Sequence, residues 1–443
     1  MKVCIIGGGG GASNAANVIR SLDGEAQIDI FTDRAEIGSL PCEMPFVLKG
    51  TLPSWESTFA FRESFYQERN INVHFNTPVT EIHRQEKRIV TGGESHQYER
   101  AILNLGATPI MPAIPGLDGR NEFFLSTNLR HARIFEEALP GYTRAAIIGV
   151  GQIGLDVAAV LQARGYQDVH LIGRSDRVLR AYLDEEMAGR IADSITENGV
   201  KLILGARELS LGSRGGGKVV HLPDRELEVD LVFLAAGAEP NVGIAREAGI
   251  EIGPSGAIAV NEYLQTSDPD IYAIGDCMEN RDALTGARIR YQTATSAATT
   301  GRLAGRNLVL GNVVTYQGTV RPFVMETFGN EVGTVGFTEE SARQQGFDIV
   351  SSITRSSTRR RAFGGKPITI KLVADRQTRT LIGAQLISGE MVAGKIDRLA
   401  LAIAERVPLQ RLALMDTCYS PTVGAGYEAV TMALDALLDK LTA

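Results

Sequence analysis

Residues 3–12 read Val-Cys-Ile-Ile-Gly-Gly-Gly-Gly-Gly-Ala, and this stretch decides the fold of the first part of the chain. A short apolar run meets a glycine loop, and the small residues that follow it suit the start of a helix. Gly7, Gly9 and Ala12 fit the pattern G-x-G-x-x-A, in which the first glycine permits a tight turn and the second lets a pyrophosphate approach the backbone. The phosphate then lies at the helix N-terminus. The stretch therefore predicts a strand–loop–helix unit that binds a dinucleotide.

A second apolar strand, residues 28–31, ends about 20 residues after this loop, where an acidic residue normally holds a ribose. Thr32 comes first and Asp33 follows, so Asp33 is the candidate, displaced by one position. We expect four further residues at the same site: Gly11, Arg34, Ser39 and Val79.

The same pattern recurs downstream. Residues 145–148 form an apolar run that leads into Gly149, Gly151 and Gly154, a full G-x-G-x-x-G, and another apolar strand follows at 169–172. One glycine loop alone is weak evidence, because such loops are common turns. Two loops, each opening a strand–loop–helix unit, predict two dinucleotide sites.

The end of the strand at 169–172 indicates which nicotinamide coenzyme binds. An NAD site would carry an acidic residue there, but this chain has Gly173, followed by Arg174, Ser175, Asp176 and Arg177. Without the acid a 2′-phosphate is not repelled, and Arg174 and Arg177 can pair with it. This favours NADPH over NADH; the alternative is a pair of solvated surface arginines.

Three other apolar segments end in small residues or in an acid. Residues 101–109 and 231–240 are each a buried strand that ends in a small-residue turn before a proline, and they are interpreted as crossings between the two nucleotide-binding units. Residues 270–276 end in Gly-Asp, whose carboxylate can accept hydrogen bonds from a ribityl chain or a ribose. The site candidates in these turns are Gly106, Ala107, Gly237, Gly275 and Asp276.

Composition bounds the class of protein. A chain of 443 residues suggests two to four domains at roughly 100–200 residues each. The net charge of −7 argues against a nucleic-acid binder, and no apolar run approaches the ~20 residues of a membrane helix. The start of the chain reads as a first strand rather than a signal peptide, so we expect a cytoplasmic enzyme. Four scattered cysteines and six histidines that do not cluster with them predict neither a disulfide framework nor a metal site.

The order of these features resembles the pyridine nucleotide-disulfide oxidoreductases over essentially the whole chain. The resemblance implies an α/β fold with two Rossmann-like dinucleotide-binding domains, for FAD and NAD(P)H, and an α+β C-terminal dimerisation domain in a homodimer. The implied domains are an FAD domain in two parts, 1–112 and 243–318, an NAD(P)H domain at 113–242 and the dimerisation domain at 319–443.

The redox cysteine places the chain within that family. Many members carry C-x-x-x-x-C, but the segment around Cys42 has one cysteine only, which resembles the single-cysteine branch of coenzyme A disulfide reductases, NADH oxidases and NADH peroxidases. Ser39, Cys42, Pro45 and Val47 are spaced as in the coenzyme A disulfide reductases. With no second cysteine in its segment, oxidised Cys42 must be a mixed disulfide with a small thiol or a sulfenic acid. The alternative is a buried, inert cysteine.

Several residues depart from the relatives. NADH peroxidases and oxidases carry a histidine in the first glycine loop where this chain has Gly10, and the C-terminal His-Pro base of the two-cysteine reductases is missing because no histidine follows His221. Asp156 stands where relatives often place Glu near the nicotinamide.

The C-terminal segment departs as well. Two tyrosines that coenzyme A disulfide reductases carry near the substrate are replaced here at Arg361 to Phe363 and at Val423. Tyr419, Tyr427 or Cys418 is the candidate to take their role, and Cys418 is either a resolving thiol across the dimer interface or a small packing residue.

A basic run remains in an otherwise acidic protein, at Arg355, Arg359, Arg360, Arg361 and Lys366. Such a run is either a solvated face or a clamp for an anionic substrate, which arginine suits because of its forked donors. We assign Arg359, Arg360 and Arg361 to substrate binding.

The expected function is an FAD-dependent NAD(P)H:disulfide oxidoreductase that reduces a small, anionic, coenzyme A-like disulfide through Cys42. The alternatives are an NAD(P)H oxidase or peroxidase that uses a cysteine sulfenic acid, and a family member that cleaves a carbon–sulfur bond.

Overall fold

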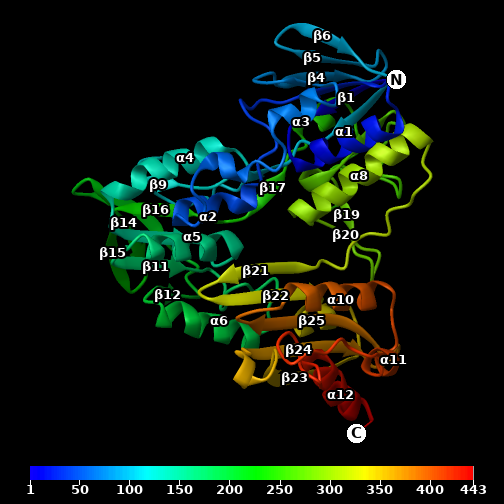
Figure 1. Ribbon diagram of the computed structural model, residues 1–443. Helices are drawn as coiled ribbons and strands as arrows, with labels where there is room; N and C mark the ends of the chain where they lie inside the picture. The colour runs from blue at the N-terminus through cyan, green and yellow to red at the C-terminus, as the bar shows by residue number, and fades with distance from the viewer. Residues whose placement is uncertain (443) are drawn as a thin grey trace.

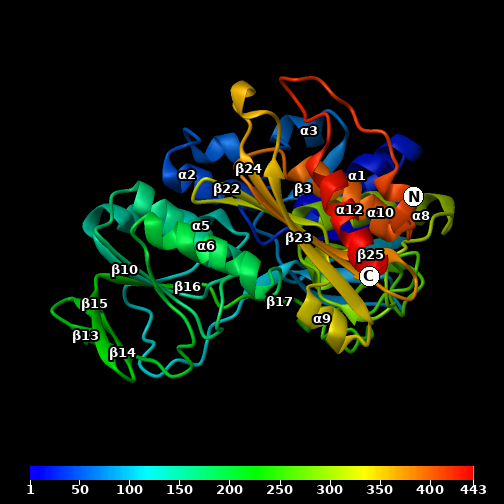
Figure 2. The same cartoon turned by 90° about the horizontal axis from the view of Figure 1, so that it is seen from below.

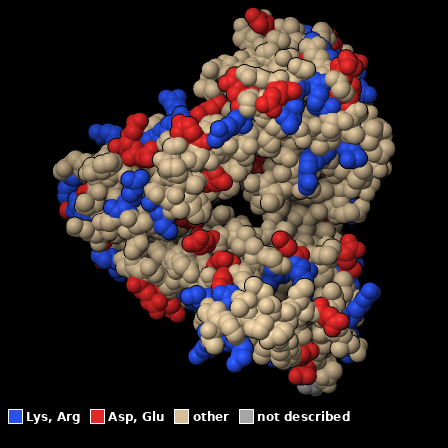
Figure 3. Space-filling view, in the orientation of Figure 1, with Lys and Arg blue, Asp and Glu red and all other residues tan. Residues whose placement is uncertain are grey.

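The structure, a computed structural model that describes residues 1–442, has three lobes (Figure 1), and the space-filling view shows a hollow between them (Figure 3). The chain begins in the first lobe, crosses into the second, returns to the first and ends in the third (Figure 1). Positive and negative side chains are interspersed over the face that Figure 3 shows, without one large patch of either sign.

A five-stranded parallel sheet forms the centre of the first lobe. Its strands are apolar because both faces are covered, by helices on one side and by a small antiparallel sheet whose residues join the same core. The sheet order is β18 (Ile271–Ala273), β7 (Arg100–Leu103), β1 (Lys2–Ile6), β2 (Gln27–Phe31) and β3 (Ile71–His74), and the small sheet is β4 (Val79–His83), β5 (Arg88–Thr91) and β6 (Glu94–Gln97).

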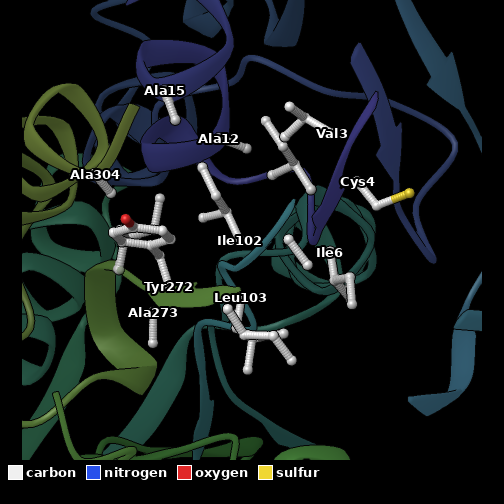
Figure 4. Close-up of a cluster of buried hydrophobic side chains, with 14 of the residues drawn as sticks. Val3, Cys4, Ile6, Ala12, Ala15, Ile102, Leu103, Tyr272, Ala273 and Ala304 are labelled. Atoms are coloured by element: carbon white, nitrogen blue, oxygen red, sulfur yellow. The ribbon is translucent and has the colours of Figure 1, made fainter. Parts of the chain in front are cut away.

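Helix α1 (Gly10–Leu22) packs against α8 (Ala294–Leu310) over this sheet. The two backbones approach closely because glycines face each other: a side chain on Gly301 would meet the carbonyl oxygen of Gly11 at 2.3 Å. Figure 4 shows how β1, β7 and β18 contribute Val3, Ile102 and Tyr272 to the core beside these helices. The glycine loop is thus held between two rigid layers.

The second lobe repeats the plan with a second parallel sheet of five strands. Three helices and an antiparallel three-stranded sheet accompany it. The sheet order is β12 (Lys201–Ile203), β11 (Asp168–Ile172), β10 (Arg144–Ile148), β16 (Leu231–Leu234) and β9 (Glu122–Phe123); the helices are α4 (Leu129–Ala138), α5 (Gln152–Ala163) and α6 (Glu185–Glu197); the small sheet is β13 (Ser210–Arg214), β14 (Gly217–Leu222) and β15 (Arg225–Val229).

Two crossings join the first two lobes and lie side by side. β8 (Ala107–Pro109) pairs antiparallel with β17 (Ala238–Pro240), so that Ala107 faces Pro240 in the register. The interpretation of 101–109 and 231–240 as crossings is confirmed for their second halves, β8 and β17, while their first halves are the sheet strands β7 and β16.

The third lobe is an antiparallel sheet of five strands covered by helices (Figure 2). Its central strands β24 and β25 are buried along almost their whole length because α10 and α12 pack on them. The sheet order is β21 (Phe323–Thr327), β22 (Asn330–Gly336), β25 (Thr380–Ser388), β24 (Pro367–Asp375) and β23 (Ile349–Ser357); the helices are α9 (Glu339–Gln344), α10 (Ala393–Ala404), α11 (Leu409–Ala413) and α12 (Ala429–Thr442).

The shorter elements are α2 (Met44–Lys49), α3 (Glu63–Gln67), α7 (Gly243–Glu247), β19 (Asn280–Arg281) and β20 (Arg288–Ile289). The predicted fold, two Rossmann-like units followed by an α+β domain, is confirmed. Within residues 1–442, no helix combines the length and the apolar character needed to cross a membrane.

Candidate active site

The first glycine loop lies between β1 and α1 as predicted. Gly7 has φ +102°, and a Cβ there would stand 2.2 Å from the carbonyl oxygen of Asn104, so only glycine fits. Gly9 is the N-cap of α1, and no side chain caps the helix. The amide of Asn104 donates hydrogen bonds of 3.3 Å to the carbonyl groups of Gly7 and Gly9 and so fixes the loop. The N-terminal N–H groups of α1 are left for an anion.

The surroundings of Asp276 indicate whether a flavin dinucleotide fits beside the first glycine loop. It lies in the 3-10 turn Gly275–Cys277 directly after β18, and this turn packs against α8. Burial raises the pKa of its carboxyl to about 6, and within residues 1–442 no hydrogen bond or ion pair reaches the carboxylate. A largely buried carboxylate without a protein donor suits a ligand that brings its own hydroxyl groups, such as a ribityl chain. The residues present fit FAD.

The other candidates of the first site are spread around β2 and the crossings. Asp33 is exposed after β2, with Arg34 3.9 Å away, and the Arg34 guanidinium donates 2.7 Å hydrogen bonds to the backbone and hydroxyl oxygens of Thr127. Ser39 forms an isolated antiparallel β-bridge with Phe59, and Val79 is the first residue of β4. The last three candidates lie at the crossings: Gly106, Ala107 and Gly237.

The second glycine loop connects β10 to α5 in the same way. Gly149 has φ +128°, and its Cβ would lie 2.1 Å from the carbonyl oxygen of Ala235. Gly151 is the N-cap of α5, again without a side-chain cap, and Gly154 lies in the first turn of the helix. The two loops therefore place the same uncapped helix N-terminus in two lobes, a geometry that suits an anion.

The arginines after β11 have different surroundings. Arg174 is exposed, and within the described part of the chain no ion pair reaches it. The Ser175 hydroxyl donates to the carbonyl of Arg177. Arg177, by contrast, is 15% exposed and forms an ion pair with Glu340 of the third lobe. Arg180, which the sequence analysis did not single out, pairs with the same Glu340 at 2.7 Å.

Cys42 is exposed and lies in the 3-10 turn Pro41–Glu43, directly before α2. Helix α2 packs against α5 of the second lobe, and Met44, Val47 and Leu48 share a core with that helix. Burial and the carboxylate of Glu43 raise the pKa of the Cys42 thiol most, and Asp156 raises it further. The chain's own side chains thus favour the thiol over the thiolate.

Asp156 lies on α5, one turn into the helix that covers the Cys42 segment. Burial raises the pKa of its carboxyl to about 7, and no hydrogen bond or ion pair within residues 1–442 reaches it. It is therefore a second unpartnered carboxylate, in addition to Asp276, and it titrates near neutral pH.

The C-terminal candidates lie in the third lobe, between α11 and α12. Cys418 and Tyr419 are exposed, and the hydroxyl of Tyr427 donates to Asp435 on α12. Cys418 lines a cavity of about 510 Å³ together with Met391, Lys395, Arg398 and Glu428. Cys42 belongs to the first lobe and these residues belong to the third.

Arg355 lies in β23, whereas Arg359 to Arg361 lie on the loop after this strand, which protrudes on the same side as the 414–428 segment (Figure 2). Arg359 is engaged, with an ion pair of 3.1 Å to Glu390 and a hydrogen bond to the carbonyl of Phe363. Arg360 and Arg361 are exposed, and within residues 1–442 neither has an ion pair. The structure separates one structural arginine from two free ones.

Three residues of the site were missed by sequence reasoning. Asn104 was detectable as a polar residue at the end of a buried strand, and Arg180 as a further arginine near Arg174. Glu340 gave no signal, because it reaches the second lobe from a distant part of the chain.

Comparisons with known proteins agree with this arrangement. The family described as pyridine nucleotide-disulphide oxidoreductase matches residues 1–301, and its dimerisation domain matches residues 327–430. An NADH oxidase of Methanocaldococcus jannaschii is 32% identical over 100% of both chains. A CoA-dependent NAD(P)H sulfur oxidoreductase of Pyrococcus furiosus is 30% identical over 95% of both. The solved structure of an engineered water-forming NADPH oxidase, a mutant of the Lactobacillus brevis enzyme, superimposes with a TM-score of 0.94 at 26% identity, covering 100% of this chain and 99% of that one.

Proposed function

Since the chain belongs to the pyridine nucleotide-disulphide oxidoreductase family and is a flavin-dependent NAD(P)H oxidoreductase, we propose that it uses NADPH to reduce a small anionic disulfide through Cys42 in a homodimer. The proposed domains keep the boundaries predicted from the sequence: FAD binding by 1–112 and 243–318, NAD(P)H binding by 113–242 and dimerisation by 319–443.

The position of Cys42 carries the proposal. Cys4 and Cys277 are fully buried, and burial raises the pKa of each thiol to about 12, so neither is available as a nucleophile at neutral pH. Cys42 and Cys418 are exposed, and of these two only Cys42 lies beside the helix that follows the second glycine loop. Cys42 is therefore the sulfur that hydride electrons from the second lobe can reach within one chain.

The reaction balances as NADPH, a proton and one disulfide giving NADP⁺ and two thiols. When bound, FAD supplies a two-electron relay between the hydride and sulfur. The Cys42 thiolate attacks one sulfur of the substrate, releasing the first thiol and leaving a mixed disulfide on Cys42. Two electrons and a proton then release the second thiol and regenerate Cys42. Asp156, the nearby carboxyl that titrates near neutrality, is proposed to hold the proton.

Two observations support an anionic substrate and a dimer. Arg360 and Arg361 offer free guanidinium groups, and one relative at 30% identity is named as CoA-dependent.

The segment from Leu414 to Tyr427 exposes large apolar side chains, which isolated chains seldom do without a partner surface. In the proposed dimer, this segment with Cys418, Tyr419 and Tyr427 covers the partner's Cys42 site.

The residues after β11 support NADPH. Gly173, Arg174 and Ser175 follow the strand where an NAD site carries an acid, and Arg180 comes five positions after the serine. The engineered NADPH oxidase carries replacements of Asp by Ala, Ala by Arg and Met by Ser at three consecutive positions, and of Pro by Arg five positions later. The order and spacing of small residue, Arg, Ser and Arg are the same.

An NAD(P)H oxidase is the second candidate, because the relative of 32% identity over both full chains is named an NADH oxidase. Cys42 would then cycle through a sulfenic acid with oxygen as the electron acceptor. Against this, the first glycine loop offers Gly10, whose Cβ direction is open, instead of an imidazole.

The test compares acceptors. The holoenzyme is assayed anaerobically with NADPH and with CoA disulfide, glutathione disulfide or cystine, and aerobically for oxygen uptake without disulfide. For the wild type we expect turnover with CoA disulfide, and mass spectrometry should find one CoA bound to Cys42. Cys42→Ser should lose turnover and retain FAD. Cys277→Ser, the control, should still form the mixed disulfide on Cys42. Oxygen uptake that matches or exceeds disulfide turnover would replace the proposal with the oxidase.

A further inference from the structure

A carboxylate from the third lobe contacts the arginines that follow β11 in the second lobe, where we propose that the coenzyme binds. Glu340, on α9, accepts from Arg180 at 2.7 Å and also pairs with Arg177, so that one carboxylate holds two guanidinium groups. Arg180 also pairs with Asp176 at 2.9 Å. The two arginines lie within eight residues of Gly173, where β11 ends.

A separate network fixes Glu340 in this place. Lys371, which is 2% exposed, lies 2.8 Å from Glu339 and 3.2 Å from Asp184, the N-cap residue of α6. The Glu339 N–H donates to the Asp184 carboxylate at 3.1 Å, and Gln385 donates to it at 2.6 Å. Because these contacts join the second and third lobes without Glu340, the backbone at Glu340 stays beside Arg180 whether or not its side chain is charged.

The charge count at the end of β11 shows the consequence. Arg177 and Arg180 contribute two positive charges, which the carboxylates of Asp176 and Glu340 balance, and the arginines lower the pKa of Glu340, so that it stays ionised. A 2′-phosphate that approaches this strand end meets Arg174 unpaired but must compete with Glu340 for Arg180. The 2′-hydroxyl of NADH makes no such demand.

We propose that Glu340 is a specificity-determining residue that weakens the binding of 2′-phosphorylated coenzyme and leaves the binding of NADH unchanged. This inference rests on the proposed function only in that residues 173–180 hold the 2′-phosphate. It explains why a residue of the C-terminal lobe bears on coenzyme choice: the third lobe sets the net charge of the subsite that the second lobe builds.

The experiment measures binding rather than turnover. Dissociation constants for NADPH, NADH and 2′,5′-ADP are determined by titration calorimetry on the FAD-loaded protein, for wild type, Glu340→Gln and Glu185→Gln. Glu185 is the matched control, because it is an exposed glutamate at the start of α6 with no ion pair among the described residues. In Glu340→Gln we expect about threefold tighter binding of NADPH and 2′,5′-ADP, with NADH unchanged; in Glu185→Gln we expect none of these changes.

Two further variants separate the possible failures. In Arg180→Gln/Glu340→Gln the gain over Arg180→Gln alone should shrink, because the released guanidinium is gone. If Arg174→Ala weakens NADPH binding but Glu340→Gln leaves it unchanged or weakens it, the role of Glu340 is wrong and the NADPH site stands. If the wild type prefers NADH and Arg174→Ala does not change NADPH binding, the proposed coenzyme itself is wrong. The thermal midpoint of Glu340→Gln, measured alongside, identifies any loss of fold.

Discussion

Asp156 of the second lobe acts electrostatically on Cys42 of the first: burial and Glu43 raise the pKa of the Cys42 thiol most, and the Asp156 carboxylate adds to the rise. Because burial also raises the pKa of Asp156 to about 7, the influence is present above pH 7 and fades below it. The packing of α2 on α5 creates this link, which joins the proposed redox sulfur to the coenzyme lobe.

Replacing Asp156 with Asn should therefore make Cys42 more reactive at pH 8. The substitution removes a negative charge that raises the pKa of the thiol, so the thiolate fraction and the rate of iodoacetamide alkylation should rise about threefold. The measurement is made in a Cys418→Ser background, in which Cys42 is the one exposed cysteine. If the variant and its Cys418→Ser parent are alkylated at the same rate at every pH from 6 to 9, the Asp156 carboxylate does not affect the pKa of Cys42.

The same substitution should stabilise the fold at alkaline pH. The native pKa of Asp156 is raised, so the stability that its protonated form provides is complete below pH 4 and is lost as the pH rises to about 7. Relative to wild type, Asp156→Asn should gain stability over this window, by up to about 4 kcal/mol at pH 8 and little at pH 4. Thermal midpoints of both holoproteins at pH 4, 6 and 8 check the slope; parallel curves would contradict the burial of this charge.

Arg174→Ala should impair NADPH and spare NADH. Loss of a free guanidinium from a phosphate subsite costs about 1.4 kcal/mol, so Kd for NADPH should rise about tenfold and that for NADH less than twofold. Arg306→Ala, an exposed arginine on α8, serves as the control. Equal losses for both coenzymes would show that Arg174 does not contact the 2′-phosphate.

Arg360→Ala/Arg361→Ala should raise KM for CoA disulfide about fivefold with little change in kcat, since uniform binding would be lost. Arg359→Ala should instead lower the thermal midpoint and leave KM unchanged, because Arg359 holds its loop through Glu390 and Phe363. If Arg359→Ala raises KM and the double variant does not, then Arg359 binds the substrate, and Arg360 and Arg361 do not.

Lys371→Met should destabilise the protein by about 3–5 kcal/mol. Lys371 is buried between the second and third lobes, and its loss leaves the buried carboxylate of Asp184 without its cation, while Glu339 keeps only the exposed Arg343. Thermal unfolding at pH 7 measures the loss, and Lys366→Met, at an exposed lysine, should be neutral. A stable Lys371→Met protein would mean that hydrophobic packing replaces the buried charges at no cost.

The sequence by itself determined the elements that depend on neighbouring residues. A glycine loop needs a left-handed turn and a close backbone approach at fixed spacing, so Gly7 and Gly149 could be located without coordinates, and both open a helix after a buried strand. The two Rossmann-like units followed from the two glycine loops, and the third, α+β lobe followed from the family resemblance. The absence of an acid at Gly173 was equally a local fact.

Tertiary structure alone decided how charges and lobes meet. The guanidinium of Arg177 is paired with Glu340, 163 residues away, so a residue expected to bind phosphate has a carboxylate partner already. Arg359, Arg360 and Arg361 are alike in sequence, yet Glu390 engages only the first. Local pattern fixes backbone conformation, because a turn or a helix is stabilised within a few residues. The pKa of a carboxyl such as Asp156 and the free state of an arginine depend on burial and on long-range partners, which only the packed fold supplies.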